Sequence, residues 1–136
     1  MASDLDRALD EALQSVPDCL LAGYIDVATG VLLAAKTACP VPREALDLLS
    51  STAADFFEHA DLGAVENWLI KSQEVQGMAT TTCQEFMVMS DQLLHMYTRC
   101  KDNSDHIVAL IAKRSANVGL MIAKSRKAAG FIDIFS

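Results

Sequence analysis

A chain of 136 residues is long enough for one domain with its own hydrophobic core, and 51% of its residues are hydrophobic against 21% charged. This composition excludes a disordered chain, and no apolar run approaches the ~20 residues that span a bilayer, which argues against membrane insertion. The net charge of −7 disfavours nucleic acid as a partner. From the length and composition we expect residues 1–136 to form a single soluble domain.

The chain begins with patterns for a helix and a hairpin. Apolar residues recur every three or four positions in the first segment, which predicts a helix over residues 3–15 with Ser3 as its cap. Two apolar runs follow, at residues 19–26 and 31–36, with Gly30 in the turn between them. They predict a β-hairpin whose glycine takes a positive φ.

A second helix is predicted over residues 43–59, directly after two prolines, and it carries two apolar stripes. One stripe consists of Ala45, Leu48, Leu49, Thr52 and Phe56. The other consists of Leu46, Ala53 and Phe57. One stripe is enough to cover a sheet, so the other needs a further surface, in the same domain or in a partner chain. We predict that Leu46, Ala53 and Phe57 face a second copy of the chain.

Residues 61–82 carry the weakest pattern in the chain. A short helix is predicted over residues 64–72, followed by a polar loop. Val65, Trp68 and Leu69 form a small apolar patch at helical spacing, which we expect to be a satellite of the core.

The last third of the sequence is rich in strands. Alternating and apolar runs predict strands over residues 85–89, 93–98 and 106–111, which suggests an antiparallel meander. A closing helix is predicted over residues 117–129 and is expected to end at Gly130.

Short motifs in this order of elements resemble the Roadblock/LC7 family over about residues 3–130. The matching pieces are Gly23-Tyr24-Ile25-Asp26, the turn Thr29-Gly30, the strand Asp105-His106-Ile107-Val108-Ala109-Leu110, and the helix entry Ala116-Asn117-Val118-Gly119-Leu120. None of these motifs is a catalytic signature. Residues 61–82 are longer than the family's usual connection, so we treat them as an irregular insertion.

The resemblance implies an α/β (α+β) domain with one five-stranded, mainly antiparallel sheet and helices on both faces. It also implies a homodimer formed through the second helix and the third strand. The predicted interface therefore comprises Leu46, Ala53, Phe57, Phe86, Met87, Val88 and Met89. Members of the family modulate Ras-like small GTPases or scaffold larger assemblies, including dynein and microbial polarity systems, without hydrolytic chemistry of their own.

The sequence lacks the motifs of common catalytic sites. It contains no Walker loop, no dinucleotide-binding glycine motif and no nucleophile elbow, so we predict no enzymatic activity and no cofactor. The four cysteines are widely spaced without a C-x-x-C pair, which predicts reduced thiols and no metal site. The N-terminus lacks a secretory signal, and we expect a cytoplasmic protein.

Two other hypotheses also fit the sequence. One is a small-molecule sensor on a profilin-like or PAS-like sheet, which requires a pocket lined by convergent polar groups. The other is an enzyme that uses Cys83 or Cys100 as its nucleophile, which requires an activating partner that the sequence does not reveal.

Overall fold

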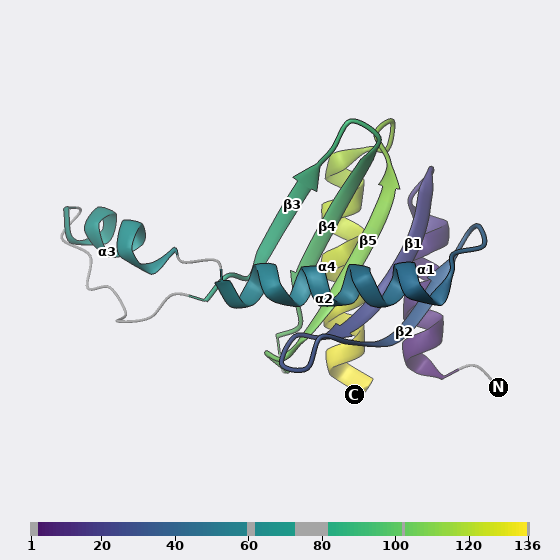
Figure 1. The fold of residues 1–136 in the computed structure, drawn as a ribbon, viewed down its shortest axis with the longest axis horizontal. Coiled ribbons are helices and arrows are strands. Elements are labelled where there is room, and N and C mark those ends of the chain that lie inside the picture. Colours follow the sequence, from purple (N-terminus) through teal and green to yellow (C-terminus); the bar gives the residue numbers. More distant parts are fainter. Residues whose placement is uncertain (1–2, 60–61, 73–81, 102, 136) are drawn as a thin grey trace.

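The computed structural model describes residues 3–59, 62–72, 82–101 and 103–135. Its centre is one five-stranded antiparallel sheet with the strand order β2-β1-β5-β4-β3 (Figure 1). The strands are β1 (Cys19–Asp26), β2 (Val31–Thr37), β3 (Glu85–Met89), β4 (Leu93–Arg99) and β5 (His106–Lys113). The predicted strands are confirmed, three of them one or two residues longer than expected.

Helices cover both faces of the sheet, as the fold class requires. They are α1 (Asp4–Ser15), α2 (Arg43–His59), α3 (Gly63–Ser72) and α4 (Val118–Phe135). Figure 1 shows α2 crossing one face, α1 and α4 side by side on the other, and α3 standing beyond β3. The predicted five-stranded α/β architecture is confirmed.

Two hydrophobic clusters, one on each face, hold these layers together. Leu9 of α1 and Met121 of α4 are fully buried on one face together with Leu110 of β5. Ile107 of β5 belongs to the other cluster, under α2. Neighbouring residues of β5 therefore face two different cores, which explains why this strand reads as a continuous apolar run rather than an alternating one.

Local hydrogen bonds and backbone geometry fix several element ends, and the predicted Ser3 cap and Gly30 turn are confirmed. The Ser3 hydroxyl accepts a hydrogen bond from the Asp6 amide at 3.0 Å and caps α1. Gly30 has a φ of +74° in the turn between β1 and β2, a conformation that favours glycine. The Asn117 side chain accepts from the Leu120 amide at 2.9 Å and caps α4.

The prediction that the closing helix ends at Gly130 is wrong, because α4 continues to Phe135. A glycine ends a helix when it adopts a left-handed conformation, and Gly130 does not have a positive φ. In the middle region, the predicted short helix is present as α3. The polar loop expected after it falls at residues 73–81, outside the described residues.

Candidate protein interaction surface

The stripe of α2 that we expected a partner to cover faces the sheet instead. Ala53 is 2% exposed, Phe57 is 6% exposed, and Leu46 packs partly buried against the same cluster. The prediction that the sheet leaves these three residues uncovered is therefore wrong.

A buried serine accounts for the error. Ser50 lies on the same side of α2 and is 1% exposed, with its hydroxyl donating to the Gly30 carbonyl at 2.8 Å. This bond satisfies the polar group where α2 meets the hairpin turn. The bond holds this side of α2 against the hairpin, so the stripe that contains Ala53 and Phe57 faces the sheet, which the sequence pattern alone does not reveal.

The outward stripe of α2 consists of Ala45, Leu48, Thr52 and Phe56, which are all exposed. Leu48 is 67% exposed and Phe56 is 47% exposed. Leu49, which we grouped with them, is partly buried against the core. Exposed apolar side chains that group on one face of a helix mark an interaction surface, whereas apolar side chains scattered singly do not.

An aromatic cluster anchors the C-terminal half of α2 to β3 and β4. The Phe86 ring lies 3.9 Å from that of Phe56 and 4.6 Å from those of Phe57 and Tyr97, measured between centroids. The Arg99 guanidinium sits over the Phe57 ring at 5.0 Å. Burial raises the pKa of Tyr97 to about 12. Phe86 is therefore held within the chain, and Phe56 stands at the outer border of the cluster.

Strand β3 forms one edge of the sheet, so only β4 pairs with it among the described strands. Val88 is 38% exposed and Met89 is 59% exposed, whereas Phe86 and Met87 are partly buried against the chain's own core. An edge strand with exposed apolar side chains is a template for pairing with another strand. The exposed stripe of α2 and the open edge of β3 together form the candidate surface.

A groove of about 220 Å³ opens on the same face of the sheet, beside the N-terminal half of α2. Its walls include Val41, Leu46 and Leu49 on one side and Leu93, His95 and Ile111 on the other. Burial lowers the pKa of His95, which favours its neutral form and keeps the groove apolar.

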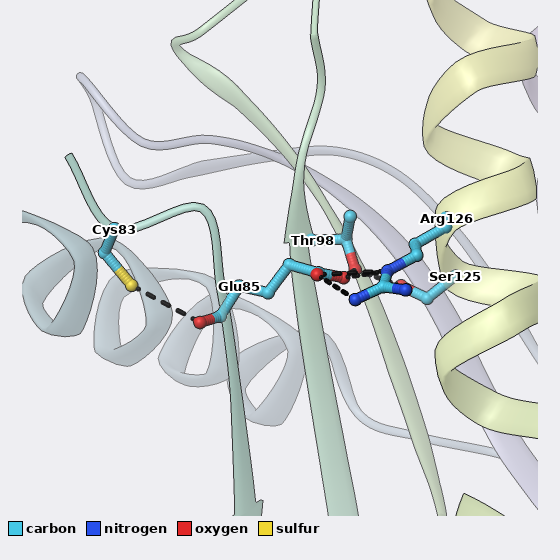
Figure 2. Close-up of polar contacts among 5 residues, drawn as sticks. All are labelled: Cys83, Glu85, Thr98, Ser125 and Arg126. Carbon is cyan, nitrogen blue, oxygen red and sulfur yellow. Dashed lines mark hydrogen bonds and ion pairs between the residues drawn. The ribbon is translucent and has the colours of Figure 1, made fainter. Parts of the chain in front are cut away.

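A polar network ties β3 to α4 on the opposite face of the sheet (Figure 2). The Arg126 guanidinium donates to the Glu85 carboxylate at 2.7 and 3.0 Å. Thr98 donates to the same carboxylate at 3.2 Å, and its hydroxyl lies 2.6 Å from that of buried Ser125. The bond from Arg126 is the main reason that the pKa of Glu85 is lowered. The network positions the edge strand rather than a reacting group.

The two cysteines considered as nucleophiles are both buried. Desolvation by burial raises the pKa of Cys83, and a raised pKa disfavours the reactive thiolate. The Cys83 thiol donates a hydrogen bond to the Glu85 carbonyl at 3.5 Å. Within the described part of the chain, no three His, Cys, Asp or Glu side chains are placed to hold a metal ion. None of the helices in those same ranges is long and apolar enough to cross a membrane.

No family model matches this sequence, and no curated protein matches it either. Solved structures do resemble it. The Roadblock/LC7 domain from Streptomyces avermitilis has a TM-score of 0.70 to this chain at 16% identity, with 98% of both chains covered. The chain has the Roadblock/LC7 fold.

Two further structures share this Roadblock/LC7 arrangement. The gliding protein MglB from Thermus thermophilus has a TM-score of 0.69 at 20% identity, over 96% of this chain and 87% of its own. An MglB with a tetrameric arrangement has a TM-score of 0.69 at 22% identity, over 98% of this chain and 90% of its own. The resemblance drawn from the sequence motifs is thus confirmed as a shared fold.

Proposed function

We propose that this Roadblock/LC7-fold chain is a non-enzymatic, dimeric regulatory or scaffolding module that binds a Ras-like small GTPase or organises a larger complex. The observation that carries the proposal is the exposed apolar stripe of α2 beside the open edge of β3. We take residues 1–136 as one domain with an insertion at about residues 61–82, and the four free cysteines favour a reducing, cytoplasmic location.

The dimer joins two copies about a twofold axis at the β3 edge. Antiparallel pairing of the two β3 strands continues the sheet from one copy into the other, and the two α2 helices then lie side by side in opposite directions. Phe56, Val88 and Met89 become buried, and each fully buried side chain of this size contributes about 1.5–3 kcal/mol of transfer free energy. Of the seven interface residues expected from the sequence, Val88 and Met89 keep this role.

The surface that the paired α2 helices present to a third molecule is acidic. Glu44, Asp47 and Glu58 are exposed on α2, where Arg43 is the basic residue near its start. Such a surface favours a partner with a basic face. The buried Cys83 with its raised pKa and the helices on both faces of the sheet support an interaction module over an enzyme or an enclosed sensor pocket.

Capture of partners from a native lysate of the source organism tests this function. The parent chain serves as bait, and the Phe56→Glu variant, which we expect to be folded but monomeric, serves as the matched control. We expect a Ras-like GTPase or a component of a larger assembly to be enriched on the parent, and the recovered GTPase to bind the purified chain directly when loaded with GTP or GDP.

Two results contradict the proposal. One is equal recovery of every protein on the parent and on a monomeric Phe56→Glu control. The other is hydrolysis of GTP or ATP by the purified chain alone, abolished by a point substitution in the chain.

A further inference from the structure

The apolar face of α3 is left in water, against our expectation that it is a satellite of the core. Val65 is 63% exposed and Trp68 is 77% exposed, and Leu62 and Leu69 lie on the same side of the helix. Figure 1 shows α3 beyond the β3 edge, away from the sheet and its other helices. A tryptophan buries on the order of 150–250 Å² when it packs, so the exposure of Val65 and Trp68 leaves a large apolar surface that the described residues do not cover.

The groove beside α2 is the complementary feature. It is lined by Val41, Leu46, Leu49, Leu93 and Ile111, with His95 as a half-buried neutral side chain. It lies beside the N-terminal half of α2, whereas α3 follows the C-terminal end of that helix. A helix of 17 residues spans about 25 Å, so the two features stand at opposite ends of α2 within one chain.

Twofold pairing brings these two ends together. In Figure 1 the C-terminal end of α2 reaches past β3, so in a dimer joined at the β3 edge this end lies over the sheet of the other copy. A twofold axis at the β3 edge lies close to this C-terminal end, so α3, which stands farther out beyond β3, extends over the other copy toward the N-terminal half of its α2. That half carries the groove, and α3 begins just after the C-terminal end, at Gly63.

We infer that α3 is an exchanged arm: in the dimer, the apolar face around Val65 and Trp68 of each copy occupies the groove beside α2 of the other copy. The inference rests on the dimer proposed above. The contact is reciprocal, because the twofold axis gives each copy one arm and one occupied groove. Helix α3 then adds a second, separate area to the interface formed by α2 and β3.

Fluorescence of Trp68 tests the inference, because it is the sole tryptophan in the sequence and therefore reports on α3 alone. The protein is diluted from micromolar to nanomolar concentration, and its emission maximum and quenching by acrylamide are recorded beside its mass. We expect a short-wavelength emission and weak quenching in the dimer. We expect a red shift and a severalfold rise in quenching over the same concentration range in which the mass falls to that of a monomer.

Two variants separate the arm from the rest of the interface. Val41→Asp places a charge in the groove, away from the outward stripe of α2, and we expect a dimer in which Trp68 is readily quenched. Asn67→Gln changes the side of α3 opposite its apolar face and should leave both readouts unchanged.

Three results overturn the inference. A dimer whose Trp68 is readily quenched at every concentration rejects the exchanged arm and leaves the proposed dimer standing. A monomer at every concentration rejects both. Protection of Trp68 that persists in the monomer shows that α3 packs on its own chain and rejects the exchange.

Discussion

Adjacent residues Phe56 and Phe57 should respond in opposite ways to the same substitution. Phe57 is 6% exposed and packs between Phe86 and Arg99, whereas Phe56 is 47% exposed and touches the cluster with one face. Phe57→Glu removes a core side chain and buries a charge in its place. Phe56→Glu places the charge on the outward stripe, where water solvates it in the monomer and a second copy excludes water in the dimer.

The expected magnitudes follow from these exposures. Loss of a buried Phe costs about 3–5 kcal/mol before any charge is buried, against a total stability of about 5–15 kcal/mol for a domain. Phe56→Glu loses one aromatic contact, worth about 0.5–1.5 kcal/mol, and the fold survives. Burial of the exposed half of Phe56 contributes about 0.7–1.4 kcal/mol per copy, so its loss from both copies weakens the dimer by roughly 10-fold to 100-fold.

Circular dichroism during urea denaturation and sedimentation equilibrium measure the two effects in parallel. We expect Phe57→Glu to be largely unfolded or strongly destabilised, and Phe56→Glu to be folded and monomeric at concentrations where the parent is a dimer. A stable Phe57→Glu variant, or a Phe56→Glu variant that unfolds, would refute the orientation of α2 and the role given to its outward stripe.

Two pH-dependent predictions concern stability. Glu85 has a pKa lowered mainly by its bond from Arg126, so it stabilises the fold above its usual pKa of about 4.5 and this contribution is lost as the pH falls through the lowered value. Glu85→Gln should lower the free energy of unfolding by less than about 1 kcal/mol at pH 7, because Arg126 is largely exposed. When the free energy of unfolding in urea is plotted against pH, the variant should show a smaller loss of stability in acid than the parent. An acid branch identical to that of the parent contradicts this. The pKa of Tyr97 is raised from 10 to about 12, so between these pH values the folded chain retains a proton that the unfolded chain loses. The stability of the fold therefore falls as the pH rises from 10 to 12. Tyr97→Phe should remove this fall in thermal melts, and a fall of the same size in the variant rejects burial of the hydroxyl as its cause.

Much of the fold follows from local patterns in the sequence. The helix over residues 43–59 and the strand over residues 19–26 have the bounds expected from their periodicity, because these depend on neighbouring residues alone. Gly30 and Ser3 were likewise identifiable, since a positive-φ turn and a helix cap need particular residue types at particular places.

The candidate site was harder to predict, because it depends on which surfaces meet. Both stripes of α2 are apolar, and periodicity cannot tell the stripe that faces the sheet from the stripe that remains exposed in one chain. Buried Ser50 and the small Ala53 mark the inner stripe, but their role requires the hairpin turn at Gly30 to be in place. For Trp68 the pattern identified an apolar face, and nothing local revealed that the described part of the chain leaves Trp68 exposed.

Hydrogen exchange of the β3 backbone tests the central claim most directly, because it reports on the edge where the two copies are proposed to join. Amide exchange is followed by mass spectrometry in peptides covering residues 85–89 at high and low protein concentration, with the central strand β5 as an internal reference for folding. The proposed dimer predicts slow exchange in β3 at high concentration and fast exchange on dilution, while β5 stays protected throughout. Equally fast exchange in β3 at every concentration, with β5 protected, would contradict a dimer formed through this edge.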